Sequence, residues 1–137
     1  MRRGFVHKWW PTVVTLAAVL WLTLAPDPVP DTGIPLFPGA DKVVHALMMG
    51  GLTSVILFDL KRLRRHERLS RRNVVWTAVS MVAFSALDEW AQGAMAMGRS
   101  TDILDFAADC TGILLASLAV PPLLERVVRP KKSSREK

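Results

Sequence analysis

The sequence predicts an all-α membrane protein, a four-transmembrane-helix bundle with both termini in the cytoplasm. Half of the 137 residues are hydrophobic, and the apolar residues fall into four blocks, at 9–25, 43–60, 74–87 and 106–124. A helix that crosses a bilayer needs about 20 predominantly apolar residues. Basic residues gather between and beyond these blocks rather than within them. Together, the block lengths and the charge distribution favour four spans.

The first block, residues 9–25, follows a basic start, as a secretory signal would. However, no small-x-small cleavage site appears, and Pro26 follows the block directly. Trp9 and Trp10 stand at its beginning, where amphipathic rings prefer the membrane interface. We therefore expect an uncleaved first span.

The other three blocks predict three further helices. The second and third reach span length only with their polar ends included, at residues 41–60 and 73–92. The fourth, residues 106–124, contains Pro121 and Pro122, which are expected to end or kink its helix. Helices of a soluble bundle show polar stripes at helical period. These blocks are instead apolar all round except at one end, which favours membrane spans.

The basic residues predict the orientation. All but two of the 18, Lys42 and Arg99, lie before the first block, between the second and third, or after the fourth. If four spans alternate, these positions share one side, which the positive-inside rule makes cytoplasmic. The chain then divides into a basic terminus (1–8), a four-helix membrane domain (9–124) and a basic tail (125–137). Topology signals and contacts with anionic lipids explain the net charge of +6, and we expect no nucleic-acid partner.

The opposite side is acidic, with eight of the 12 acidic residues. Six of them gather with a histidine, a glutamine and the two remaining bases at the same ends of blocks two to four. We call this set the outer cluster: Asp41, Lys42, His45, Asp88, Glu89, Gln92, Arg99, Asp102, Asp105 and Asp109. Charge in or beside a bilayer is costly, so such residues usually face a polar cavity and mark function.

Helical spacing predicts which members of the outer cluster share a face. Asp41 and His45 are four residues apart, as are Asp88 and Gln92. A continuous stripe follows on the last helix: Asp102, Asp105, Asp109 and Gly112. This stripe continues with small residues, which allow close helix approach. We therefore expect three polar faces to point at one another, with Asp88 and Asp109 one turn deeper and partly desolvated.

Two bases cannot neutralise six acids, so the outer cluster is expected to hold protons, a divalent cation or a cationic ligand. Oxygen-rich sites suit magnesium or calcium, and His45 would add affinity for zinc or manganese. Structural roles stay open for single residues. Asp41 and Asp105 are also candidates for helix caps, Lys42 for an interfacial anchor, and Arg99 for a counter-ion of the carboxylates.

Three motifs carry a resemblance to a known family: Asp41-Lys42-x-x-His45, then Glu89-x-x-Gln92, then Gly98-Arg99 with Asp105-x-x-x-Asp109-x-x-Gly112. In this order, over residues 10–120, they resemble the VanZ-like family of small bacterial membrane proteins. The resemblance implies a multi-pass protein of the bacterial plasma membrane with a role in the envelope. The founding member is associated with low-level resistance to teicoplanin, a lipoglycopeptide that acts on cell-wall precursors. Asp109 departs from the family pattern, which usually has asparagine there.

The preferred hypothesis is an outward pocket that binds or modifies the headgroup of an envelope lipid or glycolipid. In an enzymatic version, Glu89 or Asp109 would be the general acid or base. Asp41 would orient His45, while Lys42 and Arg99 would hold a phosphate. Candidate catalytic residues are Asp41, His45, Glu89, Asp105 and Asp109, and candidate ligand-binding residues are Lys42, Asp88, Gln92 and Arg99.

Two other classes remain open. In the first, the protein is a non-enzymatic scaffold or partner protein whose outer cluster locks the helices together. The second is a proton or cation pathway, which ranks last because the inner halves of the blocks offer only scattered serine and threonine. The sequence leaves the oligomeric state open.

Overall fold

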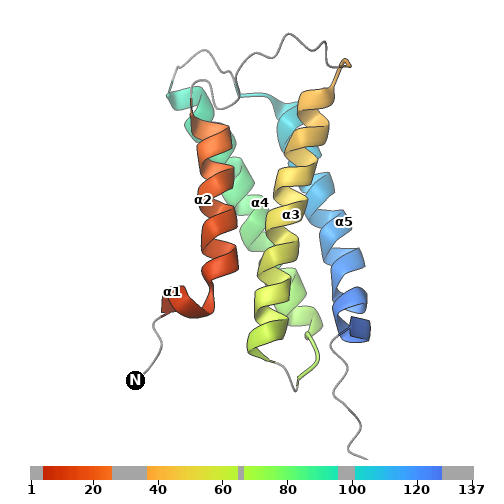
Figure 1. The fold of residues 1–137 in the computed structure, drawn as a ribbon. Helices are drawn as coiled ribbons and strands as arrows, with labels where there is room; N and C mark the ends of the chain where they lie inside the picture. Colours follow the sequence, from red (N-terminus) through yellow and green to blue (C-terminus); the bar gives the residue numbers. More distant parts are fainter. Residues whose placement is uncertain (1–4, 26–36, 65–66, 96–100, 128–137) are drawn as a thin grey trace, which may run out of the picture.

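The computed structural model describes residues 5–25, 37–64, 67–95 and 101–127, and these residues form an all-helical fold. A short helix, α1 (Phe5–Lys8), precedes four longer ones, α2 (Trp10–Leu24), α3 (Ala40–Leu63), α4 (Arg71–Ala94) and α5 (Ile103–Val127). The four long helices run side by side and alternate in direction (Figure 1). The all-helical prediction is confirmed, and each helix begins and ends within three residues of its expected span.

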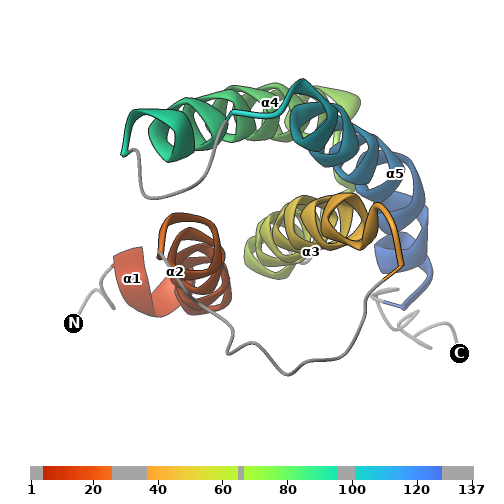
Figure 2. The ribbon, with the colours of Figure 1, turned by 90° about the horizontal axis from the view of Figure 1, so that it is seen from above.

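Helix α3 packs most extensively against α5, with α2 on its other side (Figure 2). The α3–α5 contact is made by small residues. A Cβ atom added to Gly112 would lie 2.0 Å from the carbonyl oxygen of Ala46, and one added to Gly50 would lie 3.0 Å from the oxygen of Gly112. The two backbones therefore touch, as the small-residue stripe predicts, and this contact sets the distance between His45 on α3 and Asp109 on α5.

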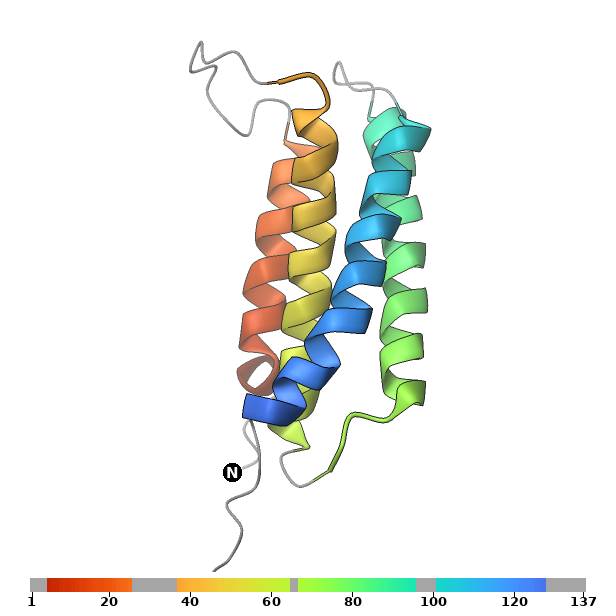
Figure 3. The same ribbon diagram turned by 90° about the vertical axis from the view of Figure 1, so that its right-hand side faces the viewer.

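Charge separates along the bundle into what we call the acidic end and the basic end. The end of α2, the start of α3, the end of α4 and the start of α5 lie together at the acidic end (Figure 3). The described part of the outer cluster lies there. The other end carries most of the basic side chains among the described residues, namely Lys8, Lys61, Arg62, Arg64, Arg68, Arg71, Arg72 and Arg126.

The bundle buries polar side chains and exposes apolar ones. The apolar core is small: Val19, Met49, Leu52, Met81 and Ile113. The buried polar and charged residues are Thr23, His45, Thr53, Asp59, Lys61, Thr77, Ser85, Asp88, Glu89, Gln92 and Asp109. Large apolar side chains such as Leu47, Trp76 and Leu118 are at least 62% exposed. This is the reverse of the distribution in soluble proteins.

Two of the described helices, α3 and α5, are long and apolar enough to cross a membrane by length and composition. Helix α2 is apolar but has only 15 residues. Helix α4 matches α3 in length, with 24 residues, but it carries Arg71 and Arg72 at one end and Asp88 and Glu89 near the other.

At the basic end, two buried charges that sequence analysis did not single out fix the helix ends. Asp59 on α3 accepts hydrogen bonds from the backbone N–H (3.1 Å) and the hydroxyl (2.8 Å) of Thr12, in the first turn of α2. It also pairs with Arg62 at 2.9 Å. Asp59 therefore caps α2 from a neighbouring helix. Lys61 was counted among the topology charges, yet it is 3% exposed and pairs with Glu125 of α5 at 3.0 Å.

One expectation about helix ends needs correction. Of the two effects expected of Pro121 and Pro122, ending the helix does not occur, because α5 continues to Val127. Beyond the prolines, the Glu125 carboxylate accepts a hydrogen bond from the Leu69 backbone N–H (2.9 Å) and so ties the end of α5 to the segment between α3 and α4.

Candidate functional site

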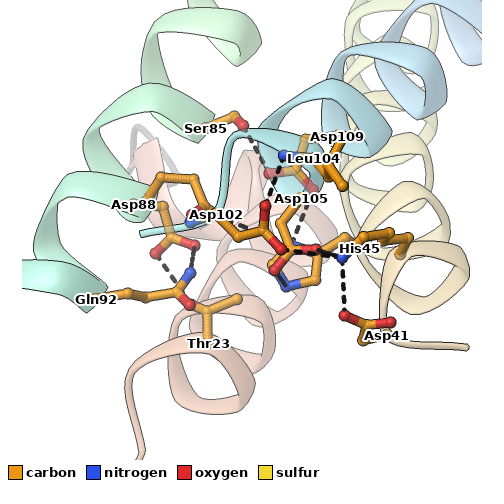
Figure 4. Close-up of polar contacts among 12 residues, drawn as sticks. Thr23, Asp41, His45, Ser85, Asp88, Gln92, Asp102, Leu104, Asp105 and Asp109 are labelled. Atoms are coloured by element: carbon orange, nitrogen blue, oxygen red, sulfur yellow. Dashed lines mark hydrogen bonds and ion pairs between the residues drawn. The ribbon is translucent and has the colours of Figure 1, made fainter. Parts of the chain in front are cut away.

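At the acidic end, three buried side chains from three helices converge. His45 Nδ1 on α3 lies 3.1 Å from Asp109 Oδ1 on α5 and 3.8 Å from Glu89 Oε1 on α4. Their exposed fractions are 8%, 0% and 3%. We call these three residues the carboxylate–histidine group. Figure 4 shows His45 beside Asp109 and Asp105.

Each member of the carboxylate–histidine group has a further contact at the atom that points away from the other two members. The Ser85 hydroxyl donates to Asp109 Oδ2 at 2.6 Å, and the backbone N–H of Asp102 donates to Glu89 Oε2 at 3.3 Å. On the far side of the imidazole ring, His45 Nε2 lies 3.8 Å from Asp105 Oδ2. Glu89 Oε1 is buried and has no hydrogen-bond partner among the described residues.

Lys42 forms the centre of a second, more exposed part of the site. Its Nζ lies 2.8 Å from Asp105, 3.0 Å from Asp41 and 3.1 Å from Asp102. These contacts use all three hydrogens of the ammonium. To hold a phosphate, Lys42 would have to release a carboxylate.

Asp102 precedes α5 and caps it, because its Oδ1 accepts a hydrogen bond from the Leu104 backbone N–H at 2.8 Å. That hydrogen bond, together with the one from Lys42, lowers the pKa of Asp102 below its ordinary value of 3.8. The carboxylate is therefore charged at neutral pH.

Asp88 and Gln92 lie apart from the carboxylate–histidine group and face α2. Asp88 Oδ1 accepts a hydrogen bond from the Thr23 hydroxyl at 3.0 Å, and Oδ2 accepts one from Gln92 Nε2 at 3.2 Å (Figure 4). The pairing of Asp88 with Gln92 is the one that their spacing predicts. The Thr23 contact ties α4 to α2.

A groove of about 310 Å³ opens between α4 and the start of α5. Its polar lining residues are Glu89, Thr101 and Asp102. Its apolar lining residues are Ala86, Trp90, Ile103 and Phe106. Glu89 thus belongs both to the carboxylate–histidine group and to the surface of the groove.

The expected convergence is confirmed for His45, Glu89 and Asp109, but Asp88 and Gln92 face α2 instead. The expected burial of Asp88 and Asp109 is confirmed. One expected contact differs, since His45 is held by Asp109 of α5 rather than by Asp41, which pairs with Lys42. Arg99 lies outside the described residues.

Sequence analysis missed two residues of the site, Ser85 and Thr23. Ser85 stands four residues before Glu89, so its spacing places it on the same face of α4. Thr23 carried no comparable signal, because its contact depends on how α2 packs against α4.

Fold and site together define a helical bundle with a buried carboxylate–histidine group at one end. No protein-family model, curated protein or solved structure matches the chain. The resemblance to the VanZ-like family therefore rests on the three motifs and stays a prediction.

Proposed function

We propose that the chain is a VanZ-like integral membrane protein that crosses the bacterial plasma membrane four times. Its acidic end faces outward and binds the polar headgroup of an envelope lipid or glycolipid. The groove between α4 and α5 carries the proposal, because both carboxylates and apolar side chains line it beside the buried carboxylate–histidine group.

The surface supports a membrane environment. Exposed apolar side chains cover the sides of the bundle, while charged groups collect at its two ends or are buried. A lipid bilayer solvates such a surface, whereas in water it would be an aggregation hazard. The bases at one end and the acids at the other fit cytoplasmic and outer faces, respectively.

The groove favours a particular chemistry of headgroup. The carboxylates of Glu89 and Asp102 accept hydrogen bonds, so they suit hydroxyl or ammonium donors, as in sugars and amines. Trp90 is 68% exposed and Ile103 is 73% exposed. Both offer apolar surface to the adjoining acyl chain or to a sugar face. An amphipathic ligand would satisfy both kinds of lining residue at once.

An enzymatic version would use Glu89 as the general acid or base, because it lines the groove and is buried on its other side. The orienting role assigned to Asp41 would pass to Asp109, which contacts the ring of His45. The Ser85 hydroxyl donates to Asp109 and is fully buried, which disfavours it as a nucleophile. Binding alone requires less of the site, so it is our primary proposal.

A scaffold role is the second candidate, and the Lys42 contacts favour it. They link the start of α3 to the start of α5 through the carboxylates of Asp102 and Asp105. Under this alternative, Asp105→Glu keeps the charge and spares function. A site that depends on exact geometry would lose function with the same change.

The test fills the groove without removing a charge. Ala86→Trp places an indole in the groove, and Ala83→Trp is the matched control, since Ala83 is also exposed on α4 but does not line the groove. We expect the wild type and Ala83→Trp to copurify with an envelope lipid in native mass spectrometry. We also expect both to protect a sensitive bacterial host against teicoplanin.

Ala86→Trp should lose the bound lipid and the protection at equal membrane abundance. Retention of both by Ala86→Trp would remove the groove from the proposal. A wild-type protein that carries no lipid and gives no protection would refute the proposed function itself.

A further inference from the structure

We propose that the carboxylate–histidine group is a binding site for a divalent transition metal ion of the Zn²⁺ or Mn²⁺ kind, with His45 Nδ1, Glu89 Oε1 and Asp109 Oδ1 as its protein ligands. The proposal concerns the metal alone and does not depend on whether the groove binds a lipid.

The ligand atoms lie close to the spacing of a metal site. All three lie within 4.8 Å of one another, and the two distances from His45 Nδ1 are 3.1 and 3.8 Å. A tetrahedral zinc ion with bonds of about 2.0–2.2 Å places its ligand atoms about 3.3–3.6 Å apart. Side-chain adjustments on the order of 1 Å would therefore close the site around an ion.

The second observation is the unpaired oxygen of Glu89. A buried carboxylate oxygen without a partner loses its hydration and gains nothing in return. Glu89 Oε1 is in that position and lies 3.8 Å from His45 Nδ1. A divalent cation there would satisfy this oxygen and neutralise the two buried carboxylates of Glu89 and Asp109.

The surrounding contacts resemble those of metal ligands. In metal sites the atom of each ligand that does not bind the ion is usually held by an outer hydrogen bond or a carboxylate. Here Ser85 holds Asp109 Oδ2, the backbone of Asp102 holds Glu89 Oε2, and Asp105 lies beside His45 Nε2. In each case the outer contact engages the other atom of the side chain, so that His45 Nδ1, Glu89 Oε1 and Asp109 Oδ1 face one another.

The donor set indicates the class of ion. One imidazole and two carboxylates suit zinc, manganese or iron better than calcium, which prefers six to eight oxygen ligands. Three protein ligands also leave a fourth position for water or another oxygen, as in catalytic zinc sites.

The test measures Zn²⁺ affinity in purified full-length protein without a histidine tag, after chelator treatment. We expect one Zn²⁺ per chain by calorimetry. Glu89→Gln and Asp109→Asn should weaken binding by at least about 10- to 100-fold, the effect of losing an outer contact alone. The matched control is Asp88→Asn, because Asp88 is equally buried beside Glu89 but engages Thr23 and Gln92 instead. Its affinity should equal that of the wild type.

Absence of Zn²⁺ binding by the wild type would overturn the proposal. It would also be overturned if Asp88→Asn weakened Zn²⁺ binding as much as Glu89→Gln and Asp109→Asn do, because the ion would then respond to the general negative charge of the acidic end. A second measurement uses the wild-type protein alone and so does not depend on the folding of any variant. The electron spin echo of bound Mn²⁺ should show ¹⁴N modulation from one imidazole, and bound Mn²⁺ without that modulation would exclude His45 as a ligand.

Discussion

At the scale of single residues, Lys42 shows how the outer cluster tolerates so many acids. Its ammonium contacts carboxylates from α3, from the residue preceding α5 and from α5 itself. Asp88 and the carboxylate–histidine group lie beyond its reach and must be satisfied by hydroxyls, an amide, an imidazole or a cation. The cluster therefore consists of three local arrangements rather than one uniform acidic pocket.

The Lys42 contacts predict a pH-dependent stability. The pKa of Asp102 is lower in the folded protein than its ordinary value of 3.8, so its contribution to stability is present above that pH and is lost as the pH falls through the lower, folded value. We expect Lys42→Met to melt below the wild type at pH 7. The difference should shrink as the pH falls below about 3.8. Thermal unfolding in detergent from pH 3 to 7 checks this, and a constant difference would show that the lysine acts through packing.

The residues of the site differ in how far the sequence could predict them. Asp88 and Gln92 share a helix, so spacing alone predicts their contact. His45, Glu89 and Asp109 come from three helices, and only the shared position of these residues near helix ends indicated that they meet. His45 contacts Asp109 rather than Asp41, and this choice depends on the rotation of α5 against α3. No pattern within one helix encodes that rotation.

At the scale of helices, the α3–α5 contact fixes the geometry of the site. Because Gly112 lies against the Ala46 backbone, any side chain at position 112 must push the two helices apart. His45 precedes Ala46 directly, and Asp109 lies one turn before Gly112. The packing of two small residues therefore determines the separation of two site residues.

This contact predicts opposite effects for two glycines. Gly112→Ala would place its Cβ 2.0 Å from a backbone oxygen and should destabilise the fold by about 1–3 kcal/mol. Gly51→Ala is the control, since nothing lies within 4 Å of its added Cβ, and it should be neutral or stabilising by up to about 1 kcal/mol. Unfolding in detergent measures both changes. Equal stability of the two variants would mean that α3 and α5 are not in backbone contact.

The helix boundaries were predictable because apolar blocks of span length leave little freedom for alternative structures. The side-chain contacts that hold the helix ends were less predictable. Asp59 caps α2 and Lys61 holds α5, but in sequence both stand among the charges at the end of the second block. Their partners, Thr12 and Glu125, lie 47 and 64 residues away. Such pairings appear only when the helices are placed side by side.

At the scale of the whole molecule, only α3 and α5 among the described helices qualify as spans by length and composition, so the proposed four spans depend on the distribution of polarity. Helix α4 carries buried acids near its acidic end, and these would be shielded from lipid by the other helices. Its remaining surface exposes Val75, Trp76, Val79 and Leu87. A helix with an apolar outer face and a polar inner face can cross a bilayer within a bundle.

Four spans with the acidic end outside predict which positions a membrane-impermeant thiol reagent reaches in intact cells. Cys110 is the single cysteine, so Cys110→Ala provides a background without thiols. In that background, Pro38→Cys at the acidic end should be labelled from outside, and Arg68→Cys at the basic end should be labelled only after the cells are opened. Both positions are exposed, so accessibility within the fold does not distinguish them. Labelling of Arg68→Cys in intact cells would reverse the orientation. Labelling of both would place the two ends of α3 on the same side, which an α3 that crosses the membrane does not allow.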